Sequence, residues 1–321
     1  MCTAISVCDK DHYFGRNLDF HYNFGETITI TPRNYRFLFK NETVISCHYA
    51  IIGTGIVSCD YPLYFDAVNE KGLGMAGLYF PQNAVYNKIS FDKTNIASFE
   101  LIPWILSQCK TVEEARKLLG DINITNEAFS EDMKPSPLHW IISDKEKSIT
   151  LEQTDMGVKV YENPVGVLTN NPTFDVQMLN LVNYMQLSTQ EPINNFCKNL
   201  SLTPYSRGMG AIGLPGDNSS MSRFIRACFV KLNSISGETE AERVHQFFHI
   251  LYSVYQQRGM VKFDDAYEIT HYTSCINATK GIYYYTTYNN GTINFVDMHK
   301  ENLNSYKIIS YDMKKISSIF F

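Results

Sequence analysis

Segments with strand periodicity and segments with helical periodicity are kept apart along this 321-residue chain, in the order strands, helices, strands, helices, strands. We expect strands at 2–7, from 12 onward, and at 26–32, 49–57, 61–68, 72–80, 138–143, 148–153, 158–161, 166–168, 268–276, 281–287 and 292–298, and helices at 97–108, 112–119, 219–233 and 241–255. This segregation favours antiparallel sheets covered by helices over a doubly wound parallel sheet, which makes the predicted fold class α+β. No repeat, low-complexity tract or linker divides the chain, so we expect a single domain over residues 1–321.

Composition and cysteine spacing narrow the classes of function. A net charge of -5 without a long Lys/Arg block argues against nucleic acid as a partner. The eight cysteines are scattered, with no C-x-x-C and no Cys/His pair at metal spacing, which predicts reduced thiols and no structural metal. The chain shows no leader pattern, no membrane-length apolar run and no phosphate-binding loop. We therefore expect a cytoplasmic protein with neither a membrane partner nor a cofactor.

Glycine is frequent in the predicted strand at 72–80, where it occupies positions 72, 74 and 77. Glycine inside a strand indicates that a second backbone, or a bound substrate, passes close to it. We therefore expect a second backbone or a substrate close to this strand.

Position 2 carries a cysteine directly after the initiator methionine. A residue as small as Cys2 permits removal of Met1, and the mature chain then begins with a thiol and an α-amine on one residue. That amine has an intrinsic pKa of about 8, so part of it is uncharged at neutral pH and able to accept the thiol proton. Cys2 is thus a candidate N-terminal nucleophile with its own base, and a small buried apolar side chain is the alternative.

A predicted hairpin returns two charged residues towards this end of the chain. Strand 2–7 is followed by the turn signal at 9–11, and Arg16 and Asp19 lie on the returning strand. An arginine close to a thiol favours the thiolate, and a carboxylate close to an amine orients it by hydrogen bonding. An ordinary ion pair at a strand end is the alternative.

Two later stretches carry further polar candidates. Asn170 follows the strand at 166–168, from where its amide is able to donate to a developing oxyanion; an Asn-Pro turn is the alternative. Arg223 falls early in the helix at 219–233, where the helix dipole disfavours a cation. Some partner is therefore expected to hold it there, and a surface arginine is the alternative.

Six stretches, in this order, resemble the choloylglycine hydrolase family, the bile salt hydrolases and penicillin V acylases among the N-terminal-nucleophile hydrolases. These stretches are Met1-Cys2-Thr3-Ala4, Phe14-Gly15-Arg16-Asn17-Leu18-Asp19, Asn69-Glu70-Lys71-Gly72-Leu73-Gly74, Pro137-Leu138-His139-Trp140, Leu168-Thr169-Asn170-Asn171-Pro172 and Gly213-Leu214-Pro215-Gly216-Asp217. The resemblance covers nearly the whole chain. It implies a four-layer αββα sandwich of two antiparallel sheets flanked by helices, and a homotetramer in which the region 188–195 is a candidate assembly loop.

The resemblance also implies roles for the catalytic candidates. Cys2 would be the nucleophile and its amine the base, Asp19 would hold the amine, and Asn170 would donate to the oxyanion. Arg16 and Arg223 would bias the thiol towards thiolate. The family's second oxyanion donor is largely the backbone N–H at the position that Tyr79 occupies here.

Substrate preference depends on a departure at this last position. Bile salt hydrolases usually read Gly-Leu-Asn-Phe where this chain has Gly77-Leu78-Tyr79-Phe80, and tyrosine there is typical of penicillin V acylases. The rest of the chain resembles bile salt hydrolases of Gram-positive gut bacteria, in some of which Ser206-Arg207-Gly208 accompanies a preference for glycine over taurine conjugates. The candidate substrate-binding residues are Phe24, Phe65, Phe80 and Phe129, with Ser206, Arg207 and Gly208, although any of the aromatic residues is equally suited to a core.

The leading hypothesis is a hydrolase that cleaves the amide between a bile acid and glycine or taurine. Penicillin V acylase activity is the alternative within the same chemistry. A non-catalytic bile acid or lipid binder is the alternative from another class, and it requires that Met1 is retained, because Met1 blocks the amine. The partner predicted in each case is a small molecule.

Overall fold

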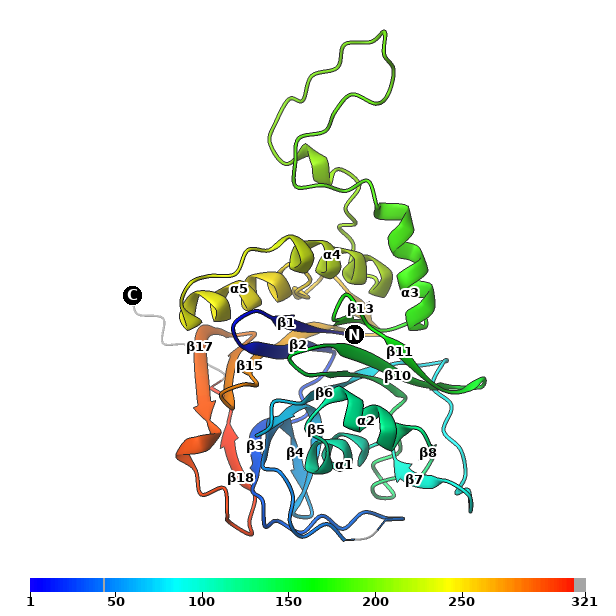
Figure 1. The fold of residues 1–321 in the computed structure, drawn as a ribbon, viewed down its shortest axis with the longest axis vertical. Coiled ribbons are helices and arrows are strands. Elements are labelled where there is room, and N and C mark those ends of the chain that lie inside the picture. The colour runs from blue at the N-terminus through cyan, green and yellow to red at the C-terminus, as the bar shows by residue number, and fades with distance from the viewer. Residues whose placement is uncertain (43, 315–321) are drawn as a thin grey trace.

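The computed structural model describes residues 1–42 and 44–314 (Figure 1). Within these residues two antiparallel sheets form the centre of the fold. The six-stranded sheet contains, in spatial order, β12 (Val167–Leu168), β1 (Cys2–Cys8), β2 (His12–Phe20), β15 (Ile269–Asn277), β16 (Ile282–Thr287) and β17 (Asn290–Asp297). The eight-stranded sheet contains β11 (Gly157–Glu162), β10 (Ser148–Thr154), β9 (Leu138–Ser143), β6 (Gly74–Tyr79), β5 (Tyr61–Asn69), β4 (Ile51–Ser58), β3 (Thr27–Thr31) and β18 (Ile309–Asp312).

Helices cover the outer face of each sheet (Figure 1). Those on the six-stranded sheet are α4 (Ser220–Asn233) and α5 (Glu240–Tyr252), and those on the eight-stranded sheet are α1 (Leu101–Gln108) and α2 (Val112–Leu119). The predicted four-layer αββα arrangement is therefore confirmed, and the predicted strands and helices lie within a few residues of their observed positions.

Alternate side chains of a strand point into different hydrophobic cores, and these cores hold the layers together. In β9, Ile141 faces the core shared by the two sheets, whereas Trp140 and Ile142 face the core under α1 and α2. In α5, Phe247 and Leu251 recur at helical spacing and close the outer side of the six-stranded sheet. The central strands of each sheet are thus covered on both faces, which explains why β5 is buried along nearly its whole length.

The two sheets are in close contact at a glycine of β6, where the group that packs against the strand is a side chain and not the predicted second backbone or substrate. A Cβ at Gly74 would lie 2.8 Å from Cγ of Phe14, a β2 side chain that is fully buried between the sheets. Glycine at this position lets the ring pack directly on the backbone of β6.

Several short elements were not predicted. They are the parallel pair β7 (Thr94–Ala97) and β8 (Ile122–Thr125), the pair β13 (Lys262–Phe263) and β14 (Ala266–Tyr267), strand β18, helix α3 (Phe174–Leu181), and the 3-10 turns η1 (Val182–Tyr184), η2 (Met209–Ala211) and η3 (Met298–Lys300). Most are four residues or shorter, too short for their periodicity to stand out from a loop.

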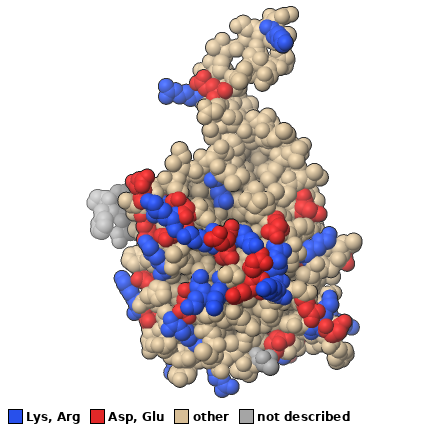
Figure 2. All heavy atoms as spheres, in the orientation of Figure 1, with Lys and Arg blue, Asp and Glu red and all other residues tan. Residues whose placement is uncertain are grey.

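The chain between α3 and α4 leaves the body as a long excursion (Figure 1). It carries large exposed apolar side chains, including Met185, Ile193, Phe196 and Tyr205. Over the body, in contrast, basic and acidic side chains are interleaved on the face drawn in Figure 2. No helix in the described part of the chain is long and apolar enough to cross a membrane.

A buried histidine ties the two sheets together. Nε2 of His12 in β2 lies 3.1 Å from the hydroxyl of Ser6 in β1 and 3.2 Å from that of Ser143 in β9, while Nδ1 lies 3.0 Å from the Gly72 carbonyl oxygen. Burial lowers the pKa of His12 to about 4, against an ordinary value near 6.5.

Acid should therefore destabilise the fold through His12. As pH falls below 6.5 the unfolded chain gains a proton at His12, whereas the folded chain stays neutral there until about pH 4, so stability is lost within this window. The loss amounts to about 3 kcal/mol at pH 4. Urea unfolding at pH 7 and at pH 4.5 measures the loss of unfolding free energy between the two pH values. This loss should be smaller in His12→Gln than in the wild type and unchanged in His245→Gln, which replaces an exposed histidine. Equal losses in the two variants would contradict this account.

Candidate active site

Cys2 is the first residue of β1 and is held between two neighbouring strands. It pairs with Leu18 of β2, and two residues further along β1 Ala4 also pairs with Leu168 of β12. Asn170 follows β12 by two residues, and its Oδ1 accepts a hydrogen bond of 2.9 Å from the backbone N of Cys2. The side chain of Cys2 is buried. The sheet register thus brings residues 2 and 170 together.

Arg223 reaches the same place from the helical layer. It lies in the first turn of α4, whose cap is Ser219, and is fully buried. Its Nη1 donates to the Cys2 carbonyl oxygen at 2.5 Å and to Thr3 Oγ1 at 2.7 Å, and its Nη2 donates to Asn170 Oδ1 at 2.7 Å. Burial lowers its pKa, and the negative charges of Asp19 and Cys2 oppose that effect. These partners explain why a cation occupies the start of a helix.

Arg16 approaches from the opposite side, between the sheets. It pairs with Ala4, so its side chain shares the inner face with those of Ala4 and Cys2. Pairing between β5 and β6 stops at Ala76, and Nη1 of Arg16 bridges the gap by donating to the carbonyl oxygens of Phe65 (3.1 Å) and Gly77 (2.6 Å). Burial disfavours the charge of Arg16, but electrostatic attraction to Cys2 and then to neighbouring acidic groups outweighs burial and raises the Arg16 pKa.

Asn170 also contacts the end of β6. Its Nδ2 donates to the Tyr79 carbonyl oxygen at 2.6 Å. Because Phe80 N–H donates to the Pro137 carbonyl on the β9 side, the alternation of an antiparallel strand directs the Tyr79 N–H to the other side, where β5 no longer pairs. The side chain of Asn170 and the backbone of Tyr79 therefore lie next to each other beside Cys2.

Asp19 lies where β2 ends, opposite residue 1. Its backbone pairs with Met1: the Met1 ammonium donates to the Asp19 carbonyl at 2.7 Å, and Asp19 N donates to the Met1 carbonyl at 3.0 Å. Its Oδ1 accepts from Thr270 at 2.6 Å, whereas Oδ2 is buried and has no partner among the described residues. Burial raises the Asp19 pKa, and Arg223 and the terminal ammonium oppose the rise. Glu268, which sequence reasoning missed, forms a 3.0 Å ion pair with that ammonium.

Two of the predicted substrate-binding residues belong to an aromatic cluster that adjoins this site. The rings of Phe24 and Phe65 lie 5.3 Å apart, and Phe20 joins Phe24 (4.9 Å) to Tyr79 (6.4 Å). Tyr22, half exposed, lies 4.7 Å from Phe24. Phe20 and Tyr22 were missed, although the aromatic run at 20–24, directly after Asp19, is a signal for them.

The other predicted substrate-binding residues lie elsewhere. Phe80 is fully buried under Tyr79, stacked on His139. Phe129 packs on Tyr61 in the core under α1 and α2. Ser206, Arg207 and Gly208 belong to the excursion between α3 and α4, away from the strands that carry Cys2 and its neighbours (Figure 1).

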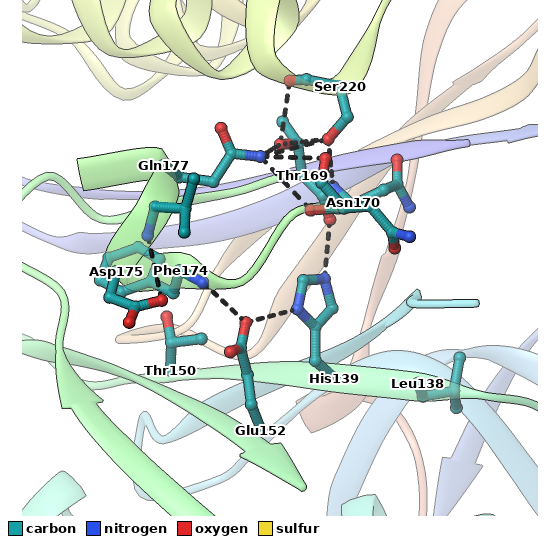
Figure 3. A network of polar contacts seen from close by, with 12 residues as sticks. Leu138, His139, Thr150, Glu152, Thr169, Asn170, Phe174, Asp175, Gln177 and Ser220 are labelled. Carbon is teal, nitrogen blue, oxygen red and sulfur yellow. Dashed lines mark hydrogen bonds and ion pairs between the residues drawn. The ribbon is translucent and has the colours of Figure 1, made fainter. Parts of the chain in front are cut away.

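Sequence reasoning also missed a polar network behind Asn170 (Figure 3). The Ser220 hydroxyl accepts from Asn170 N at 2.9 Å, and Nε2 of Gln177 lies 3.4 Å from the Asn170 carbonyl oxygen. His139 and Glu152 form a buried pair that reaches the same segment. His139 stands in one of the stretches that carry the family resemblance, which was the available signal.

Arg16 should be a large contributor to stability, because its loss leaves Asp66 buried beside it without a positive charge. We expect Arg16→Met to lower the free energy of unfolding by about 3 kcal/mol or more. Arg116→Met, which removes an exposed ion pair to Glu162, should cost at most about 1 kcal/mol. Urea unfolding at neutral pH measures both, and similar losses in the two variants would contradict the role given to Arg16.

Comparison with known proteins agrees with this geometry. The sequence matches the family described as linear amide C-N hydrolases, choloylglycine hydrolase family, over residues 2–311. It is 51% identical to the bile salt hydrolase/transferase of Lactiplantibacillus plantarum, over 98% of this chain and 97% of that protein. A crystal structure of a mutant conjugated bile acid hydrolase from Clostridium perfringens superposes with a TM-score of 0.93, at 40% identity, over 100% of this chain and 99% of that one.

A more distant structure shares the fold. The penicillin V acylase from Agrobacterium tumefaciens superposes with a TM-score of 0.77 over 97% of this chain and 91% of that one, at 20% sequence identity. The family match over residues 2–311 and the 51% identity to the Lactiplantibacillus plantarum protein over 98% of this chain decide the assignment. The chain belongs to the choloylglycine hydrolase family of linear amide C–N hydrolases.

Proposed function

We propose that this protein hydrolyses the amide bond between a bile acid and its conjugated glycine or taurine, with Cys2 as the nucleophile. The observation that carries the proposal is the arrangement at Cys2. Removal of Met1 turns the backbone nitrogen of Cys2 into an amine, and this nitrogen already contacts Asn170 Oδ1. Two buried arginines, Arg16 and Arg223, flank Cys2. The 51% identical relative is named a bile salt hydrolase/transferase, which supports this substrate.

Loss of Met1 also brings a new hydrogen-bond donor close to Asp19. Asp19 Oδ2 is buried beside the chain terminus and has no partner within the described residues. The freed amine of Cys2 takes a place in which Asp19 and Asn170 Oδ1 are able to accept its hydrogens. In its uncharged form the amine accepts the thiol proton.

The reaction then runs in two halves. Cys2 Sγ attacks the amide carbonyl carbon, and the α-amine passes its proton to the departing nitrogen of glycine or taurine. Asn170 Nδ2 has two hydrogens, of which one bonds Tyr79 O, so the second is available to the oxyanion together with the Tyr79 N–H. A donor of this kind contributes about 3 to 4 kcal/mol.

Water then cleaves the thioester and releases the bile acid. If an amine took the place of water, the bile acid would be transferred to that amine. The 51% identical relative is named a transferase as well as a hydrolase. The aromatic cluster of Phe20, Tyr22, Phe24, Phe65 and Tyr79 offers an apolar wall to the steroid, so binding energy from the acyl half supports the step at the thiol.

The oligomer we propose is a homotetramer in which the excursion between α3 and α4 packs against other copies. Its exposed apolar side chains, Ile193 in the region 188–195 among them, form a surface suited to burial. Residues 185–215 carry only three charged side chains. Light scattering measures the state directly, and a monomeric full chain at micromolar concentration would contradict it. The eight free cysteines fit the cytoplasmic location we propose.

Cys2→Ala should abolish turnover and preserve binding, because the substitution removes the attacking sulfur and leaves the aromatic cluster intact. We expect glycocholate hydrolysis at the uncatalysed background, with a dissociation constant for glycocholate, from calorimetry, close to the KM of the wild type. Cys47→Ala, which removes an exposed thiol, is the matched control and should retain full activity. Hydrolysis by Cys2→Ala clearly above background would exclude Cys2 as the nucleophile.

Side-by-side rates decide between the bile salt and penicillin V readings. We expect kcat/KM on glycocholate or taurocholate to exceed that on penicillin V, because the relatives of high identity are named for bile salts. Tyr79→Asn, which restores the usual bile salt hydrolase residue, should lower the penicillin V rate relative to the glycocholate rate. A wild-type rate on penicillin V well above both bile salt rates would reverse the assignment. Comparing glycocholate with taurocholate tests the preference proposed for Ser206–Gly208.

A further inference from the structure

A fully buried histidine lies directly behind Asn170 (Figure 3). His139, in β9, has Nδ1 3.0 Å from Glu152 Oε1 and Nε2 2.9 Å from the carbonyl oxygen of Thr169. Glu152 lies in the adjacent strand β10, one residue beyond the pair formed by Leu151 and Trp140, so the strand register makes the two side chains neighbours. The ring therefore links a carboxylate to the residue that precedes Asn170.

The same carboxylate reaches the other end of this segment. Glu152 Oε1 also accepts a 3.0 Å hydrogen bond from the backbone N of Phe174, the first residue of α3. The His139–Glu152 pair thus holds Thr169 on one side of Asn170 and Phe174 on the other. A segment fixed at both ends allows the amide of Asn170 little freedom to move.

The histidine ring also supports the second oxyanion donor. Phe80 stacks on it with the centroids 4.1 Å apart and the rings inclined by 8°, and Phe80 directly follows Tyr79. One ring therefore contacts both parts of the site: the Thr169 carbonyl before Asn170 and the side chain after Tyr79.

The pair is also hard to replace chemically. Both ring nitrogens lie within hydrogen-bond distance of an oxygen, Glu152 Oε1 on one side and the Thr169 carbonyl oxygen on the other. Removing the ring leaves the buried Glu152 oxygen and the Thr169 carbonyl oxygen without this partner, so nearby backbone must shift or admit water.

We propose that His139 and Glu152 are positioning residues that keep the Asn170 amide and the Tyr79 N–H at the separation that an oxyanion requires. They touch neither substrate nor the thiol. The inference rests on the proposed function for its kinetic consequence, although the geometric consequence, displacement of Asn170 relative to Tyr79, is independent of any substrate.

The test compares His139→Gln with a matched histidine outside the site. His48 is also buried, lies 2.7 Å from the Tyr49 carbonyl oxygen and 2.9 Å from that of Tyr35, and contacts the ring of Phe37. Both substitutions should lower the melting temperature. Per folded molecule on glycocholate, His139→Gln should lower kcat about 10- to 100-fold with KM changed less than about threefold, a smaller loss than removal of a whole oxyanion donor. His48→Gln should leave both constants unchanged.

Crystal structures supply the second readout. In His139→Gln the distance from Asn170 Nδ2 to the Tyr79 carbonyl oxygen should lengthen from 2.6 Å, and in His48→Gln it should not. Phe80→Leu keeps the His139–Glu152 pair and removes the stacked ring, so it serves if His139→Gln does not fold, and it should lower kcat with little change in KM.

The distance from Asn170 to Tyr79 and the kcat per folded molecule each test the positioning role. An Asn170 amide that stays in place, or a kcat per folded molecule equal to that of His48→Gln, would overturn the positioning role. If the wild-type protein cleaves no conjugated bile salt, the proposed function fails, and the crystallographic distance still judges the positioning role by itself.

Discussion

The structure depends on a buried arginine that joins three parts of the chain which are distant in sequence. Arg223, from the first turn of α4, donates to the carbonyl oxygen of Cys2 at the start of β1 and to the side chain of Asn170 beyond β12. A buried guanidinium is stable only when its donors find acceptors. The helix, the strand end and the Asn170 segment are therefore held in one arrangement, and that arrangement surrounds Cys2, the proposed nucleophile.

A second buried arginine performs the equivalent task between the sheets. Arg16 joins β2 to the point where β5 and β6 separate, through the carbonyl oxygens of Phe65 and Gly77. The two arginines approach Cys2 from opposite faces of the same sheet. In the proposed mechanism, this positive charge on both sides favours the thiolate form of Cys2. The two arginines that hold the sandwich together at this end are thus the same ones to which the proposed mechanism gives the task of activating the thiol.

Much of this arrangement could be predicted from the sequence, and there is a physical reason why the rest could not. Alternation and helical spacing located the main strands and helices, and the hairpin length placed Arg16 near Cys2. The dipole argument for Arg223 was correct that partners hold it. Phe129 lies in the loop after β8, where no periodicity indicates the direction of a side chain, and it packs with the second core. His139 and Glu152 look like ordinary strand residues until the register of β9 and β10 brings them together.

The most direct test of the account is the mass of the N-terminal peptide during turnover. A reaction with glycocholate quenched in acid after milliseconds should give a peptide that begins at Cys2, lacks Met1 and carries a cholyl group as a thioester on the cysteine. Turnover by a chain that retains Met1, or a cholyl adduct on any other residue, would contradict the central claim that Cys2 is a free N-terminal nucleophile.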